Sequence, residues 1–347
     1  MYIDSHCHFR DEEQKDKETI AHGLRVALDS GLEIVIDMPN TARPVTTRER
    51  VLDRFKLALQ ANSQVIYGTY IGLTADKEQI REAVKTCREF AWKPGARTFV
   101  AGIKAFWGKS VGDLSITSPE LQRFAVSTLA DLGYEGVLAG HYEKESLLKP
   151  ELFNPKKPET WNLARPEEAE IFSLQDIVTF AMLSHFNGKL HVCHVSTPLS
   201  VQLVSDYKHH MKISCEVSPH HLLLDTNVMQ SGEGILYKVN PSLRSPETRE
   251  ELFAAFLRGD IDTLASDHAP HTLAEKLDAP YLSGIPNVAS WRDFVGLLSN
   301  AGAGYSLITK MTFDNPCKIF NIGSSMTNRG GRNRVSEYVF DPYACLK

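Results

Sequence analysis

The stretch Tyr2-Ile3-Asp4-Ser5-His6 predicts a short β-strand, the first element of a repeating pattern. An amphipathic segment at 16–30 predicts a helix after it, and Gly31 interrupts that helix. The apolar run Leu32-Glu33-Ile34-Val35-Ile36-Asp37 then predicts a second strand. One strand followed by one helix is therefore the expected building unit.

The same unit recurs along most of the chain. Strands are predicted at 2–6, 32–37, 65–71, 101–106, 136–141, 190–195, 212–217 and 263–267. Helices are predicted at 16–30, from 46 onward, and at 76–92, 119–132, 166–186 and 198–209. This order predicts an α/β fold in which parallel strands close into a (β/α)8 barrel of the TIM type. The alternative is an open, doubly wound sheet, but no glycine-rich dinucleotide or phosphate loop follows any predicted strand.

Three segments do not follow the repeat. Longer loops are expected at about 142–165 and 225–262, and the residues from Gly323 onward lack clear periodicity. We therefore expect one barrel domain at 1–322 and an irregular C-terminal tail at 323–347.

Composition narrows the class of protein. The chain has 347 residues, a formal net charge of −5 and six scattered cysteines. It contains no long basic run, no signal-peptide pattern and no apolar stretch of the roughly 18 residues that a membrane helix needs. We expect a cytoplasmic protein with reduced thiols that acts on a small molecule, with neither nucleic acid nor a membrane as its partner.

Six residues able to bind metal or carry charge fall at or just after the ends of predicted strands: His6, His8, Lys104, His141, His194 and Asp267. In a (β/α)8 barrel these strand ends face one mouth, where enzymes of this fold carry their active sites. Residues far apart in the sequence should therefore converge there. The set offers nitrogen and oxygen ligands, which suit zinc or, less commonly, another divalent transition metal.

Two pairs of residues depend on strand alternation. His6 and His8 project to one face of a strand, although such a pair is more often surface or core histidine when it occurs alone. Around 191–195, alternation places Cys193 on the face of His191 and leaves His194 on the other face. We expect His194 to be the ligand and His191 to pack behind the site.

Lys104 and Asp267 are charged residues in apolar runs. A lysine inside a buried strand is costly unless it is paired or neutralised, so Lys104 is a snorkelling lysine, an ion-pair partner or a functional group. Reaction of its amine with carbon dioxide would give a carbamate, a carboxylate that can bridge two metal ions. Asp267 ends the apolar run at 263–266 and is either a ligand or an ion-pair partner.

These motifs resemble the amidohydrolase superfamily, and within it the cyclic amidohydrolases, which include dihydroorotases, allantoinases and hydantoinases. The resemblance covers nearly the whole chain. It rests on the following segments, in order: His6-Cys7-His8-Phe9-Arg10, Met38-Pro39-Asn40-Thr41, Gly102-Ile103-Lys104, His191-Val192-Cys193-His194-Val195-Ser196-Thr197, Glu216-Val217-Ser218-Pro219-His220-His221-Leu222, Lys238-Val239-Asn240-Pro241-Ser242-Leu243-Arg244, Asp260-Ile261-Asp262-Thr263 and Ser266-Asp267-His268-Ala269-Pro270-His271-Thr272.

The resemblance implies a binuclear zinc site at the C-terminal mouth of the barrel. Asp267 would also be the catalytic acid–base group, which takes a proton from the attacking hydroxide and passes it to the leaving ring nitrogen. The implied ligands fall into three groups: His6, His8 and Asp267 on the more buried ion, His141 and His194 on the more exposed one, and carboxylated Lys104, with a hydroxide, on both.

The sequence also departs from the family pattern. Asp11 follows Arg10 where many longer dihydroorotases carry Pro-Gly shortly after the first motif, and Pro241-Ser242 replaces a tandem proline. Tyr142 stands before Glu143 where relatives usually have a small residue. The accessory β-sandwich of the family is expected to be largely absent.

The choice among cyclic amides depends on substrate contacts. The resemblance implies that Arg10, Asn40 and His271 hold a carboxylate and that Asn240 is a further contact. An arginine fork suits a carboxylate, which dihydroorotate has and allantoin and simple hydantoins lack. We therefore favour the reversible opening of dihydroorotate to N-carbamoyl-L-aspartate, a step of de novo pyrimidine biosynthesis, by an enzyme that could be a homodimer. The alternatives are an allantoinase or hydantoinase, a non-catalytic relative, and a surface role for Arg10 in a salt bridge to Asp11 or Glu12.

Overall fold

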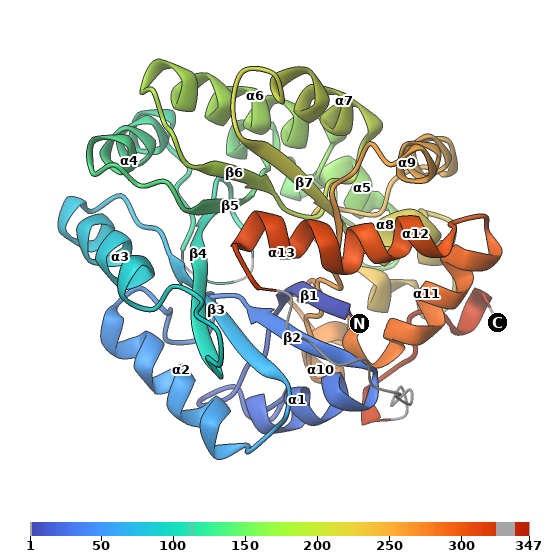
Figure 1. Ribbon diagram of the computed structural model, residues 1–347. Coiled ribbons are helices and arrows are strands. Elements are labelled where there is room, and N and C mark those ends of the chain that lie inside the picture. The colour runs from blue at the N-terminus through green and yellow to red at the C-terminus, as the bar shows by residue number, and fades with distance from the viewer. Residues whose placement is uncertain (1, 111, 113, 324–336, 347) are drawn as a thin grey trace.

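The computed structural model describes residues 2–110, 112, 114–323 and 337–346, and its centre is one sheet of eight parallel strands. The strands pair in chain order, as the barrel prediction requires (Figure 1). Their bounds are β1 Tyr2–Cys7, β2 Leu32–Asp37, β3 Ile66–Gly72, β4 Thr98–Phe106, β5 Val137–His141, β6 Lys189–Val192, β7 Ile213–Val217 and β8 Thr263–Leu264.

The barrel closes between β8 and β1 through side chains and a single bridge. Strand β8 is only two residues long, so it ends earlier than the predicted 263–267. Beyond it, the His8 backbone N–H donates to the His268 carbonyl at 2.7 Å. The Ser266 backbone N–H donates to Asp4 Oδ1 at 2.9 Å. The chain after β8 is therefore tied to β1 without continuing as a strand.

Helices surround the strands, and most begin where the sequence predicts. Except in α6, the N-terminal caps of the principal helices are hydroxyl or carboxylate side chains that accept a backbone N–H. Thr47, for example, caps the helix that was expected from 46 onward. The principal helices are α1 Ile20–Asp29, α2 Arg48–Gln60, α3 Lys77–Glu89, α4 Pro119–Asp131, α6 Glu167–Leu183, α7 Pro198–Tyr207 and α9 Pro246–Arg258. No helix within the described ranges is both long and apolar enough to span a membrane.

Helix α9 lies inside 225–262, so the prediction of a loop there is wrong for its second half. Ser245 caps this helix and Pro246 occupies its first turn, a start signal that the sequence does contain. The loop predicted at 142–165 holds only single-turn 3₁₀ pieces and the short helix α5 Trp161–Ala164. The described tail, 337–346, contains one 3₁₀ turn and no strand or α-helix, while 324–336 lie outside the described residues.

The structure contains five further helices that the sequence did not suggest. They are α8 Pro219–Leu223, α10 Leu273–Leu277, α11 Trp291–Asn300, α12 Tyr305–Thr309 and α13 Asn315–Phe320, where α8 precedes β8 and the rest follow it. In Figure 1, α12 and α13 cross the end of the barrel that faces the viewer. Phe313 and Phe320 pack there into an interior cluster with Ile3, Ile34 and Phe99. These residues fill the N-terminal end of the barrel.

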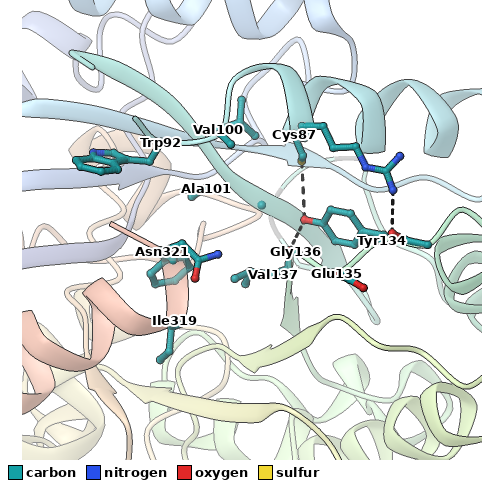
Figure 2. Close-up of a pocket in the computed structure, with 15 residues that line it drawn as sticks. Cys87, Trp92, Val100, Ala101, Tyr134, Glu135, Gly136, Val137, Ile319 and Asn321 are labelled. Carbon is teal, nitrogen blue, oxygen red and sulfur yellow. Dashed lines mark hydrogen bonds between the residues drawn. The ribbon is translucent and has the colours of Figure 1, made fainter. Parts of the chain in front are cut away.

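A cavity of about 370 Å³ lies at this N-terminal end, between β4, β5, α3 and α13. Its walls carry Trp92, Tyr134 and Asn321 (Figure 2). The Tyr134 hydroxyl donates to the Val137 carbonyl at 2.9 Å and also lies 3.8 Å from Cys87 Sγ. This cavity is on the opposite side of the barrel from the predicted site residues.

Candidate active site

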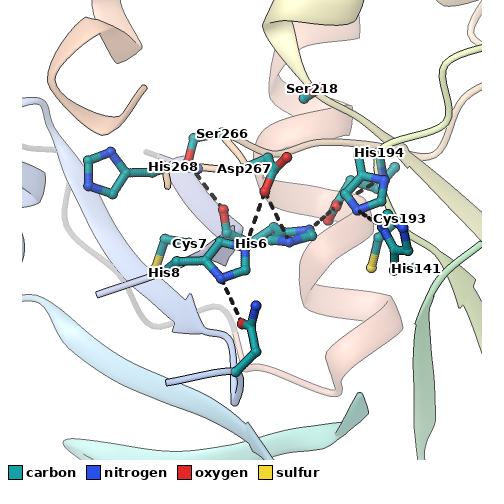
Figure 3. A network of polar contacts seen from close by, with 12 residues as sticks. His6, Cys7, His8, His141, Cys193, His194, Ser218, Ser266, Asp267 and His268 are labelled. Carbon is teal, nitrogen blue, oxygen red and sulfur yellow. Dashed lines mark hydrogen bonds and ion pairs between the residues drawn. The ribbon is translucent and has the colours of Figure 1, made fainter. Parts of the chain in front are cut away.

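The structure brings the predicted ligand residues together at the C-terminal mouth. His6 is in β1, Lys104 in β4, and His141 is the last residue of β5. His194 and Asp267 follow the ends of β6 and β8. Figure 3 shows His6, His8, His141, His194 and Asp267 pointing toward one region, although they are spread over more than 260 positions of the sequence.

The first half of the site consists of His6, His8 and Asp267. The Nε2 atoms of His6 and His8 each lie 3.3 Å from Asp267 Oδ1. One ligand atom from each of these residues lies within 4.8 Å of the others, a spacing that can hold a metal ion. These three side chains are therefore close enough together to bind one metal ion, although their role as ligands remains a prediction.

The second half consists of His141 and His194. His141 Nδ1 and His194 Nε2 face one another at 3.3 Å. The His194 ring centroid is 5.2 Å from that of His6, so the two halves adjoin. Two neutral nitrogens at this separation can share a metal ion between them.

The outward-facing nitrogens of three histidines have polar partners. His6 Nδ1 lies 2.6 Å from Glu216 Oε1, and His8 Nδ1 lies 2.9 Å from Asn40 Oδ1. His141 Nε2 is 2.8 Å from Glu143 Oε2. Such partners fix the ring tautomer and direct the other nitrogen inward, as metal-binding histidines require.

Burial sets the protonation of these groups. Loss of hydration lowers the pKa of His6 and His141, and lowers the pKa of His8 and His194 well below the usual value. The rings are therefore neutral near pH 7, with lone pairs available for a metal ion. Burial also raises the pKa of Asp267, which suits a group that must take up and release a proton.

Lys104 is fully buried beside the histidines. Its Nζ donates to Cys193 Sγ at 2.9 Å, which is the only hydrogen-bond acceptor that the described residues give it. Burial raises the pKa of the Cys193 thiol to about 12, so the thiol is neutral and cannot balance an ammonium charge. A buried cation with no anionic partner is costly, and conversion of the amine to a carbamate removes that cost.

The backbone is strained at two of the six residues. His194 has φ 37° and Asp267 has φ 48°, in the left-handed region that non-glycine residues rarely adopt. The expectation that His194 enters the mouth by strand alternation is wrong: Cys193 belongs to the interior cluster, and Val192 packs in the outer layer. His194 reaches the mouth because the chain turns after β6, and its backbone N–H lies 3.4 Å from Glu216 Oε1.

The predicted substrate residues lie around the same cavity. Arg10, Asn40 and Asn240 line it together with the histidines and Asp267. Arg10 is 2% exposed, and its guanidinium contacts His271 Nε2 at 3.2 Å and the Pro270 carbonyl at 3.3 Å. Asn240 Oδ1 accepts from Trp161 Nε1 at 3.2 Å. His271 therefore lies behind Arg10 rather than beside the four histidines of the predicted metal site.

Two supporting residues, Glu216 and Glu143, were not predicted. Glu216 contacts His6, accepts from the Ser5 hydroxyl at 3.0 Å and lies 3.4 Å from His191 Nε2. Burial alone raises the pKa of Glu216, but its contacts with His6 and His191 outweigh burial and leave the pKa well below the usual value. Glu143 pairs with His141 and with Arg165. The available signal was a carboxylate within an apolar strand at 216 and directly after one at 143.

No protein-family model matches the chain, but individual proteins do. It is 30% identical over 330 residues to a dihydroorotase of Methanothermobacter thermautotrophicus, across 93% of this chain and 69% of that protein. It is 31% identical over 328 residues to a dihydroorotase of Halobacterium salinarum, across 92% of this chain and 71% of that protein. A dihydroorotase of Thermococcus kodakarensis is 31% identical over 345 residues, across 98% of this chain and 72% of its own length.

Solved structures show the same fold at lower identity. An L-hydantoinase from Arthrobacter aurescens superposes with a TM-score of 0.80 at 22% identity, across 96% of this chain and 73% of that one. A dihydroorotase from Campylobacter jejuni superposes with a TM-score of 0.70 at 17% identity, across 94% of this chain and 84% of that one. These likenesses confirm the (β/α)8 fold class.

Proposed function

This chain belongs to the dihydroorotase family, and on that premise we propose that it opens the ring of (S)-dihydroorotate to N-carbamoyl-L-aspartate and closes it in reverse. The observation that carries the choice of substrate is Arg10. Its guanidinium lines the cavity, is almost completely buried, and has no carboxylate within ion-pair distance among the described residues. A buried guanidinium charge is costly without an anionic partner, and the carboxylate of dihydroorotate supplies that partner.

The residues present fit the metal site of the family. Four neutral histidines, one carboxylate and a buried lysine amine are the donor set, and their inward atoms converge. We propose two zinc ions, one held by His6, His8 and Asp267, the other by His141 and His194, with Lys104 as a carbamate on both. When bound, such ions lower the pKa of water so that hydroxide is available near neutral pH, and they polarise a carbonyl group.

The protein side chains then have defined tasks. Asp267 accepts the proton of the attacking water and transfers it to the ring nitrogen as the bond from that nitrogen to the carbonyl carbon breaks. The products of that bond cleavage are a carboxylate and a ureido group, which together make N-carbamoyl-L-aspartate. In the reverse reaction, Asp267 takes the proton from the ureido nitrogen and returns it to the departing water.

Orientation of the ring is the task of the cavity wall. Arg10 holds the carboxylate that does not react, with His271 behind it, and Asn40 and Asn240 contribute amide groups. Asn240 is itself fixed by the indole N–H of Trp161. This arrangement presents the opposite edge of the ring to Asp267.

Turnover of four compounds side by side tests the function: dihydroorotate, N-carbamoyl-L-aspartate, allantoin and hydantoin. We expect turnover of the first two and little of the others, because only the first two carry the carboxylate that Arg10 is proposed to bind. Faster turnover of allantoin or hydantoin would replace the proposed substrate, and absence of all four activities in zinc-loaded protein would indicate a non-catalytic relative.

A further inference from the structure

The C-terminal tail packs beside the segment that carries Asp267. Residues 337–346 lie against α1 and the residues after β8, and Glu337 is bonded to His22 and Arg25 of α1. Two tyrosines of this tail, Tyr338 and Tyr343, send their hydroxyl groups inward. Neither hydroxyl touches a proposed metal ligand, but each begins a chain of hydrogen bonds that ends next to Asp267.

The first chain of bonds runs through Glu18. The Tyr338 hydroxyl donates to Glu18 Oε1 at 2.6 Å, and Glu18 Oε2 lies 2.8 Å from His268 Nε2. His268 Nδ1 accepts the backbone N–H of Asn287 at 3.0 Å, so the ring proton sits on Nε2 and points at Glu18. The ring of Tyr338 also meets the ring of His268 edge-on, with centroids 5.2 Å apart. His268 is thus fixed on both of its nitrogens.

The second chain of bonds runs through Asn287. The Tyr343 hydroxyl donates to Asn287 Oδ1 at 3.0 Å, and Asn287 Nδ2 donates to the Ser266 carbonyl at 2.6 Å. Tyr343, Asn287 and Ser266 are each fully buried. In a dry setting these bonds are costly to leave unmade, so they hold Ser266 firmly.

The two chains of bonds therefore end on Ser266 and His268, the residues on either side of Asp267. Figure 3 shows these two residues beside Asp267. Asp267 has a left-handed backbone at φ 48°, and β8 has already ended at Leu264. Strained conformations of this kind persist only where their surroundings hold them. Asp267 itself belongs to no strand. Its neighbours are held by the bridge from His268 to Cys7 and by the bonds that lead to the tail.

We propose that Tyr338 and Tyr343 are positioning residues, which act through Glu18 and Asn287 to keep the Asp267 carboxylate on the metal site. The tail would then complete the active site instead of merely ending the chain. This inference rests on the role of Asp267 in the proposed function. It assigns a role to the described part of 323–347, which the sequence suggested only as an irregular tail.

The test uses the full-length chain with Tyr338→Phe, Tyr343→Phe and the double variant. Each change removes one hydroxyl and keeps the ring. Tyr134→Phe is the matched control, because it removes a buried tyrosine hydroxyl at the N-terminal end of the barrel. The zinc dissociation constant is measured by competition with a chelator, alongside kcat, KM and the melting temperature.

We expect Tyr338→Phe and Tyr343→Phe each to raise the zinc dissociation constant and lower kcat, by up to about tenfold, which is the lower end of the effect of groups bonded directly to metal ligands. KM should stay within about twofold, because Arg10 and Asn240 are untouched, and the double variant should lose more than either single one. Tyr134→Phe should change stability alone.

The zinc dissociation constant decides the outcome. If both tail variants bind zinc as tightly as Tyr134→Phe does, the tail only packs against the barrel and the proposal is wrong. A parent protein that binds zinc but does not turn over dihydroorotate would overturn the proposed substrate instead. The comparison of zinc binding would still decide the role of the tail in that case.

Discussion

The two ends of this barrel are built from the same eight strands and look quite different. The N-terminal end has a cavity of about 370 Å³ with Trp92, Tyr134 and aliphatic residues in its walls. The C-terminal mouth has a tighter cavity, whose walls contain His6, His8 and Asp267. The larger cavity is therefore not where the chemistry-bearing side chains meet.

The difference between the two ends shows which features distinguish a functional site in this fold. At the N-terminal end, polar groups meet ordinary partners: Lys189, for example, donates to two backbone carbonyls and to Asn321. At the mouth, Lys104 is buried against a neutral thiol and Asp267 has a left-handed backbone. A left-handed backbone alone does not distinguish the mouth, because Asn321 at the N-terminal cavity also has φ 55°. A buried lysine whose hydrogen-bond partner is a neutral thiol does distinguish it, and such a departure from ordinary packing is typical of functional sites.

The largest effect is expected when Lys104, the buried lysine at the mouth, is replaced. Lys104→Ala deletes the proposed bridging group, so zinc content and turnover should fall together, turnover by at least about a thousandfold. Zinc analysis and a dihydroorotate assay measure the two effects. Acetate or another short carboxylic acid should restore part of the activity, because it can occupy the place of the carbamate.

Lys189→Ala is the matched control, since Lys189 is a strand lysine at the opposite end of the barrel. It should leave zinc content and turnover unchanged. Normal zinc content in Lys104→Ala would contradict the assignment of Lys104, and so would an experimental structure with an unmodified amine far from any metal ion.

The next largest effect is expected for Asp267→Asn. The amide keeps the shape of the side chain but cannot take up the proton, so turnover should fall by at least about a hundredfold. Asp262→Asn is the control: Asp262 precedes β8 at the other end of the barrel and pairs with Lys208. If Asp267→Asn turned over dihydroorotate normally, the proton would have to pass through another group, and His271 would be the next candidate.

The order of the strands and the position of most site residues could be predicted from the sequence. His6, His141 and Asp267 all lie at the ends of predicted strands, and parallel strands that close in order must bring such ends together. The six predicted ligand residues do meet at one mouth. Their metal-binding roles remain predictions.

The features of the site that the sequence did not predict depend on contacts between distant parts of the chain. Glu216 is one acid among many in the sequence, and its importance comes from His6, 210 positions away. The inward direction of His194 depends on a turn after β6 that strand periodicity does not encode. Helix α9 was missed for a different reason, because Ser245-Pro246 is a start signal that was available.

A smaller and more selective effect is expected for Arg10→Met, which separates substrate binding from metal chemistry. Loss of a charge-assisted bond of about 1.5–3 kcal/mol should lower kcat/KM for dihydroorotate by at least about tenfold. Zinc content should stay normal, because Arg10 contacts His271 and Pro270 but none of the proposed ligands. Arg10→Lys should recover little, since a point charge does not reproduce the planar fork.

Residual activity on hydantoin, which lacks the carboxylate, serves as the internal control for Arg10→Met and should be unchanged. Unchanged kcat/KM for dihydroorotate in this variant would mean that Arg10 has a structural role. The hydantoinase or allantoinase alternative would then gain support.

The smallest effect is expected at the N-terminal cavity, where Tyr134→Phe removes a hydroxyl that is bonded to the Val137 carbonyl. The loss of one buried hydrogen bond should lower the free energy of unfolding by about 1 kcal/mol, measured by chemical denaturation. Turnover and zinc content should not change, because the bond links the start of β5 to its own preceding loop. A loss of turnover would mean that the two ends of the barrel are coupled. Since the interior between them is filled by Phe99, Tyr70 and other large side chains, such coupling would have to pass through β4 or β5, which carry Lys104 and His141 at their far ends.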